Sequence, residues 1–266
     1  MFERVGIIGT GNMGSAVAKA VYKSGLVKEI YLSNRTPSKS QVLAKELGGI
    51  ATSNELIART CNLIILGVKP HMMQEALDSI TLLLRNRKDE FVLASMAAGL
   101  SCQRIQEMMG ATFPVIRFMP NTPCAVGGGV VQYCGRGATE QNLKDFAALL
   151  APAGLVDQLD ESLIDAASAV SGCGPAFAYQ FVEALADGGV ACGLPRDKAV
   201  AYAAQMLEGA AKMVLESGKH PGALKDAVCS PGGTTIQGVR KLEEGGFRAA
   251  AMNAVIAAYE KTLTIK

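Results

Sequence analysis

Residues 5–14 read Val-Gly-Ile-Ile-Gly-Thr-Gly-Asn-Met-Gly. The apolar start is typical of a buried strand, and the residues from Asn12 to Ser24 have the periodicity of a helix. Between them, Gly9 permits a tight turn, Gly11 lets a pyrophosphate approach the backbone, and Gly14 lets the helix pack closely on the sheet. The helix N-terminus also offers free N–H groups to phosphates. A plain tight turn is the alternative, but the strand-turn-helix context favours a dinucleotide site formed by Gly9, Thr10, Gly11, Asn12, Met13 and Gly14.

Outward from this turn, strand and helix patterns alternate up to about residue 160. The predicted strands are Val5–Ile8, Glu29–Leu32, Asn62–Leu66, Phe91–Ala94, Val115–Phe118, Val130–Tyr133 and Leu155–Gln158. Helical stretches between them include Asn12–Ser24, Ser38–Leu47, Ser101–Met109 and Glu140–Leu150. This alternation predicts an α/β, Rossmann-like, doubly wound and mostly parallel sheet with helices on both faces.

Beyond residue 160 the pattern contains only helices. They are predicted at Ser162–Ser168, Pro175–Cys192, Pro195–Ser217, Pro221–Ala227, Thr234–Glu244 and Phe247–Thr264. We therefore predict a cofactor-binding domain over residues 1–160 and an all-α domain over residues 161–266. Several of these helices are apolar on more than one face, which predicts that they intertwine with those of a second chain.

The composition excludes several classes of protein. The net charge is +2 and no basic run occurs, which argues against nucleic-acid binding. No apolar run reaches the roughly 18 residues of a membrane span, and the first residues do not have the layout of a signal peptide. We expect a cytoplasmic protein that binds neither nucleic acid nor a membrane.

The chain has seven cysteines and two histidines. The cysteines form no Cys-x-x-Cys pair or other short metal-binding spacing, so we predict no metal site. Scattered thiols of this kind suit a reducing compartment.

The residues after the second predicted strand indicate which cofactor binds. An acidic side chain there would accept bonds from a ribose 2′-hydroxyl, but this chain has Ser33-Asn34-Arg35-Thr36. Arg35 can pair with a 2′-phosphate or stack on adenine. This segment favours NADP(H) as the cofactor, with NAD(H) as an alternative. The segment could also be an ordinary solvated turn with no role in cofactor binding.

A later loop, Ser230-Pro231-Gly232-Gly233-Thr234-Thr235, leads into a predicted helix. Such a loop presents several N–H groups to a small anion such as a carboxylate. Thr234 and Gln237 have the spacing of a capping box, so a simple helix cap is the alternative.

Several segments resemble the pyrroline-5-carboxylate reductase family. They are Gly67-Val68-Lys69-Pro70, Ser95-Met96-Ala97-Ala98-Gly99, Met119-Pro120-Asn121-Thr122-Pro123, Ser171-Gly172-Cys173-Gly174-Pro175-Ala176 and Leu224–Thr235. They cover essentially the whole chain in order. The resemblance implies reduction of 1-pyrroline-5-carboxylate to L-proline by NAD(P)H, the last step of proline biosynthesis. It also implies a homodimer through the C-terminal helices, often assembled into a decamer.

The resemblance further implies roles for single residues. Ser33 and Asn34 would hold the adenosine side, and the rest of the cofactor would lie along Asn54, Val68, Lys69, Pro70, Met96, Ala97 and Ala98. Thr235 matches the family threonine beside the substrate ring nitrogen, and we assign it orientation of that atom. Gly233 and Thr234 would donate N–H groups to the carboxylate, and Glu161 matches an acidic position near the substrate. Two departures are Ala227, where many relatives have Asn, and Cys173, where Ser is commoner.

Two other functions compete with this interpretation. A β-hydroxyacid dehydrogenase needs a lysine as general base in the helix after a Gly-rich turn, but Pro175–Phe181 contains none. A non-catalytic NADPH sensor would not need the anion-binding loop at Ser230–Thr235. Both remain alternatives to be separated by assay.

Overall fold

The computed structural model describes residues 1–265, which form two compact units. The first unit holds Met1–Cys173 and residues 258–265, and the second holds Gly174–Ala257. The last strand ends at Gln158, whereas the units divide after Cys173. The domain boundary at residue 160 therefore stays a prediction.

In the described residues, the first unit is built around an eight-stranded sheet of order β3-β2-β1-β4-β5-β6-β7-β8. Only β6 and β7 are antiparallel, and all other neighbours are parallel. This confirms the mostly parallel sheet. The strands are β1 (Arg4–Ile8), β2 (Glu29–Ser33), β3 (Ile50–Ala51), β4 (Leu63–Leu66), β5 (Val92–Ser95), β6 (Val115–Pro120), β7 (Gly129–Arg136) and β8 (Gly154–Gln158).

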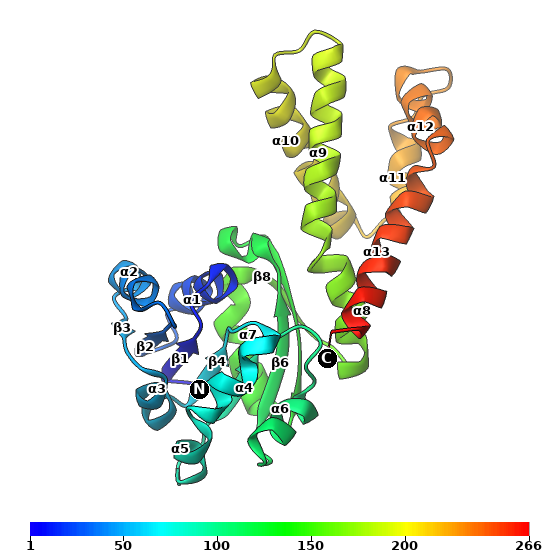
Figure 1. The fold of residues 1–266 in the computed structure, drawn as a ribbon. Coiled ribbons are helices and arrows are strands. Elements are labelled where there is room, and N and C mark those ends of the chain that lie inside the picture. Colours follow the sequence, from blue (N-terminus) through cyan, green and yellow to red (C-terminus); the bar gives the residue numbers. More distant parts are fainter. Residues whose placement is uncertain (266) are drawn as a thin grey trace. The chain divides into compact units, whose positions relative to one another are not determined.

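Helices cover both faces of this sheet, as Figure 1 shows. Successive side chains of β1 point to opposite faces of the sheet, so Ile7 packs in one buried hydrophobic cluster and Ile8 in the other. The first cluster is covered by α1 (Asn12–Ser24), α2 (Pro37–Leu47) and α7 (Glu140–Leu150). The second is covered by α3 (Asn54–Thr60), α4 (Met73–Asp78), α5 (Thr81–Arg85), α6 (Cys102–Met109) and α8 (Glu161–Ser171).

Some elements of the first unit were not predicted from the sequence. These are the two-residue strand β3, the short helices α3 and α5, and 3-10 turns at Thr122–Val126 and Ala151–Ala153. The sequence pattern also did not indicate whether β7 runs parallel or antiparallel to β6. Residues 121–128 are the whole connection from β6, and a parallel crossover needs about a dozen residues or more. The short connection therefore makes β7 antiparallel.

The second unit is helical and contains few buried side chains. Its helices are α9 (Gly174–Ala191), α10 (Arg196–Ser217), α11 (Pro221–Ala227), α12 (Thr234–Glu244) and the part of α13 (Phe247–Leu263) up to Ala257. Within the described residues of α9–α13, only Ala186, Ala199 and Ala203 are buried. None of the described helices is long and apolar enough to cross a membrane.

Candidate functional site

The predicted glycine turn lies between β1 and α1. Gly9 has a φ of +100°, and its N–H donates to the Ser33 carbonyl oxygen at 2.8 Å. A Cβ on Gly9 would lie 2.7 Å from the carbonyl carbon and oxygen of Gly67, and one on Gly14 would overlap the Gly9 carbonyl oxygen. A Cβ on Gly11 would meet nothing within 4 Å. Gly9 and Gly14 are thus required by the backbone, and Gly11 leaves open space at the helix N-terminus.

A groove of about 850 Å³ lies at this turn, lined by the carboxyl ends of β1, β2 and β3 and by the segments that follow β1, β2, β3 and β4. The sheet order reverses beside β1, since β2 follows on one side and β4 on the other. Open α/β sheets bind ligands at this kind of switch point. Eight of the predicted cofactor residues line the groove: Gly9, Gly11, Ser33, Asn34, Arg35, Asn54, Val68 and Lys69.

Hydrogen bonds fix the polar side chains at the end of β2. Ser33 Oγ donates to Asn54 Oδ1 at 2.6 Å, and Asn54 Nδ2 donates to Ser79 Oγ at 3.1 Å. Asn34 Oδ1 accepts from the Thr10 backbone N–H at 3.1 Å. Asn34 therefore ties the loop after β2 to the glycine turn.

Arg35 and Lys39 both line the groove, and neither forms an ion pair with any described residue. Lys39 was missed by sequence reasoning, although it follows Arg35 closely and lies in the first turn of α2. Two cations at this end suit an anionic group.

Acidic side chains also line the groove, namely Glu55 and Glu75. A hydrogen bond with Ser53 lowers the pKa of Glu55 below its usual value. Glu55 is therefore ionised at neutral pH, and the groove carries charges of both signs.

The other predicted cofactor residues do not line the groove. They are Thr10, Asn12, Met13, Gly14, Pro70, Met96, Ala97 and Ala98. Asn12, Met13 and Gly14 form the first turn of α1, and Pro70 begins a 3-10 turn beside the groove. Met96, Ala97 and Ala98 follow the carboxyl end of β5, and Ala97 is buried. Their contacts with a cofactor stay a prediction.

Glu161 begins α8 in the first unit. Its Oε1 accepts from the Cys102 backbone N–H at 2.7 Å and lies 3.9 Å from Nη1 of Arg117. Its side chain is one-third exposed. Glu161 thus caps the start of α6 in addition to any role near the substrate.

Gly233, Thr234 and Thr235 lie in the second unit, at the start of α12. The Gly233 N–H donates to the Ser230 carbonyl oxygen at 3.0 Å, which closes the loop. The predicted capping box is wrong, because Gly233 itself is the N-cap, in extended conformation, and Thr234 already belongs to the helix. No side chain caps this helix start, and the hydroxyl-bearing Thr234 and Thr235 are exposed. The first N–H groups of α12 remain available to an anion.

Comparisons with known proteins cover nearly the whole chain. A family model described as pyrroline-5-carboxylate reductase dimerisation matches residues 161–265, and one described as NADP oxidoreductase, coenzyme F420-dependent, matches residues 4–99. The pyrroline-5-carboxylate reductase of Pisum sativum is 42% identical over 97% of this chain and 94% of its own length. That of Escherichia coli K12 is 40% identical over 98% of both chains.

The comparison with solved structures points to the same family. The crystal structure of Plasmodium falciparum pyrroline carboxylate reductase with NADP bound has a TM-score of 0.88 and 34% identity, and covers 99% of this chain and 98% of that one. Identity of this extent over nearly the full length of the chain leaves one conclusion. The chain belongs to the pyrroline-5-carboxylate reductase family.

Proposed function

We propose that this chain reduces 1-pyrroline-5-carboxylate to L-proline with NADPH. The observation that carries the proposal is identity of about 40% to curated reductases over nearly the full length of the chain. The reaction adds a hydride to the imine carbon and leaves a protonated ring nitrogen. Such an imine, once protonated, is already a strong electrophile, so the protein has chiefly to bind and orient its reactants.

The groove suits a dinucleotide. Gly11 leaves room for a pyrophosphate at the N-terminus of α1, whose first N–H groups would donate to it. Ser33 and Asn34 would hold the adenosine ribose from positions fixed by their own hydrogen bonds. NADPH supplies the hydride when it is bound.

Arg35 and Lys39 would bind the 2′-phosphate of NADPH. A charge-assisted hydrogen bond contributes about 1.5–3 kcal/mol, so we expect Arg35→Ala to raise KM for NADPH roughly 10- to 100-fold. KM for NADH, which lacks this phosphate, should change less than about 2-fold. Steady-state kinetics with both cofactors measures the two effects.

The matched control for this substitution is Arg59→Ala, which removes an exposed cation from α3 outside the groove. It should leave both KM values unchanged. Equal losses for NADPH and NADH in Arg35→Ala would contradict a role in 2′-phosphate binding and would favour stacking on adenine.

The start of α12 would bind the substrate. Backbone N–H groups at Gly233 and Thr234 would donate to its carboxylate, where the helix dipole favours negative charge. The Thr235 hydroxyl can donate or accept, so it would orient the ring nitrogen without acting as an obligatory acid. Glu161, on α8, would be the acidic residue near the substrate.

The first assay should contain pure protein, NADPH and 1-pyrroline-5-carboxylate, with NADPH absorbance and proline followed together. A parallel reaction should contain the semialdehyde of a short β-hydroxyacid. Turnover in the first reaction alone supports the proposal. Turnover in the second alone would mean a β-hydroxyacid dehydrogenase, and NADPH binding without turnover in either would mean a sensor.

The protein would form a homodimer through its C-terminal helices, with a decamer as the larger assembly. Supporting this are the many large apolar side chains that α10 and α13 expose, among them Tyr202, Met206, Met213, Leu215, Met252 and Ile256. Monomers rarely expose apolar residues at this density, because burying them is favourable.

Met206→Glu should therefore lower the native mass measured by light scattering. An exposed methionine in a monomer tolerates glutamate, whereas one buried between chains does not. Leu82→Glu is the matched control, since Leu82 is an even more exposed apolar residue but lies on α5 of the first unit. A wild-type mass in Met206→Glu would place the interface elsewhere.

We also propose a cytoplasmic location. All seven cysteines lie in the described part of the chain and are free thiols. Unpaired thiols persist in reducing compartments.

A further inference from the structure

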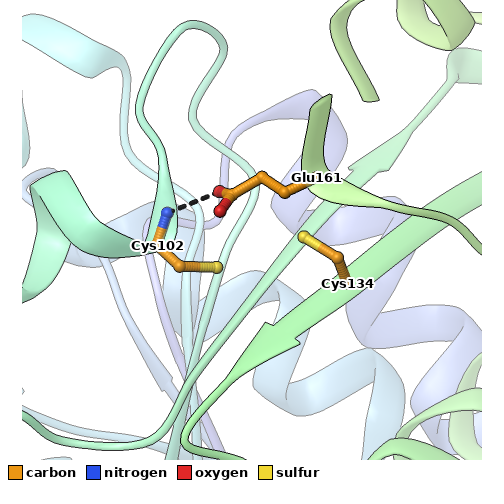
Figure 2. Close-up of side chains that lie close together, drawn as sticks. All are labelled: Cys102, Cys134 and Glu161. Atoms are coloured by element: carbon orange, nitrogen blue, oxygen red, sulfur yellow. Dashed lines mark hydrogen bonds between the residues drawn. The ribbon is translucent and has the colours of Figure 1, made fainter. Parts of the chain in front are cut away.

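Two cysteines and a glutamate from distant parts of the sequence meet in the first unit. Cys102 is the first residue of α6, Cys134 lies on β7, and Glu161 is the first residue of α8. The two sulfur atoms and a carboxylate oxygen all lie within 4.8 Å of one another. Figure 2 shows the two sulfurs and the carboxylate facing a common centre.

The three members of the cluster differ in exposure to solvent, and Glu161 is the most exposed of them. Cys102 and Cys134 are buried, with 0% and 6% of their surface exposed. The Glu161 side chain is 32% exposed.

These separations suit a metal ion bound by sulfur and oxygen. Zinc lies about 2.3 Å from thiolate sulfur and about 2.0–2.2 Å from carboxylate oxygen, which places tetrahedral ligands roughly 3.5–3.8 Å apart. Ligand atoms already within 4.8 Å need only small movements to reach this geometry. The backbone bond from Cys102 N–H to Oε1 of Glu161 would continue to orient the carboxylate.

The neighbouring charges also permit such an ion. The buried Arg117 guanidinium forms ion pairs with Asp165 and with Glu161, so these three side chains carry one net negative charge. Two neutral thiols add nothing to this sum. A divalent ion that displaces both thiol protons adds two positive charges and creates two thiolates, which leaves the total unchanged.

We propose that Cys102, Cys134 and Glu161 form a binding site for a borderline or soft divalent transition-metal ion of the Zn²⁺ class. Binding releases two protons, one from each thiol, and requires no oxidant. Three protein ligands leave the fourth position to water. The thiolates select against Mg²⁺ and Ca²⁺, which prefer oxygen ligands.

This proposal is an alternative to the prediction of no metal site. That prediction rested on cysteine spacing along the chain, and Cys102 and Cys134 are brought together only by the fold. The proposal shares Glu161 with the proposed substrate site, but its test is independent of the enzymatic function because it measures metal binding and not turnover.

Co²⁺ titration of the reduced protein tests the site, because bound cobalt shows both a sulfur-to-cobalt charge-transfer band and visible bands of tetrahedral coordination. The exposed or half-buried Cys173, Cys192 and Cys229 should first be changed to serine in the full chain. In this background we expect one Co²⁺ per chain with both signatures, displaced by Zn²⁺ and unaffected by Mg²⁺.

Cys134→Ser and Cys102→Ser, made separately in that background, should each weaken Co²⁺ binding by more than about 100-fold. Removing a residue that only hydrogen-bonds to a metal ligand already lowers metal affinity 10- to 100-fold, and removing a ligand itself should lower it more. Cys124→Ser, which removes a buried thiol elsewhere, should bind like the background protein. Circular dichroism verifies that each variant is folded.

Absence of the charge-transfer band in the background protein overturns the proposal whatever the variants do. So does a charge-transfer band that appears in folded Cys134→Ser or Cys102→Ser at the same Co²⁺ concentrations as in the background protein, or one that disappears in Cys124→Ser. If the background protein shows no charge-transfer band, Cys102 and Cys134 serve only as small apolar side chains of the core.

Discussion

Thr235→Val is expected to lower kcat/KM for 1-pyrroline-5-carboxylate on the order of 100- to 1000-fold, the loss typical of removing one positioned hydrogen-bond donor from an active site. Valine has the shape of threonine without its hydroxyl. Thr235 is exposed on α12 and its side chain does not cap the helix, so the substitution should leave thermal stability unchanged. Initial rates and thermal denaturation measure the two effects separately.

Thr235→Ser restores the hydroxyl and should recover most of the lost activity. KM for NADPH should stay near its wild-type value in both variants, because Thr235 is assigned to the substrate and not to the cofactor. Full turnover together with full substrate affinity in Thr235→Val would show that another group orients the ring nitrogen.

Gly9→Ser is expected to destabilise the fold by roughly 2–6 kcal/mol, from a left-handed backbone conformation and from overpacking together. The φ of +100° is strained for serine, and the new Cβ would lie 2.7 Å from the Gly67 carbonyl group. That group is backbone at the end of β4 and cannot rotate away. A loss of this size is a large part of the 5–15 kcal/mol that stabilises a typical domain, so cofactor binding should be lost as well.

Gly11→Ser makes the same chemical change two residues later, with a different expected result. The φ of Gly11 is −72°, a Cβ there meets nothing within 4 Å, and serine is a good N-cap residue. Stability should therefore stay within about 0.5 kcal/mol of the wild type. NADPH affinity should fall, because the new side chain occupies the space proposed for the pyrophosphate.

Chemical denaturation and a fluorescence titration with NADPH compare these two glycine variants. Unchanged stability in Gly9→Ser would contradict the close approach of β1 and β4. Unchanged NADPH affinity in Gly11→Ser would show that the pyrophosphate does not bind at the N-terminus of α1.

Most of the sheet could be predicted from sequence because its signals are local. Residues 63–66 form a continuous apolar run, and they are fully buried in β4. The turn at Gly9 is likewise set by a few neighbouring residues. The missed elements have weak local signals: β3 is a two-residue exposed edge strand, and α3 and α5 are too short for a full amphipathic pattern.

By itself, the sequence determined the alternating order of strands and helices, the glycine turn at the end of the first strand and the change to helices alone after the last one. These follow from periodicity and backbone preference over a few residues. Only the tertiary structure decided that Lys39 shares a groove with Arg35, and that Cys102, Cys134 and Glu161 meet. Such contacts depend on strand order and helix placement, which bring distant residues together through packing of the whole core and leave no repeating pattern in the sequence.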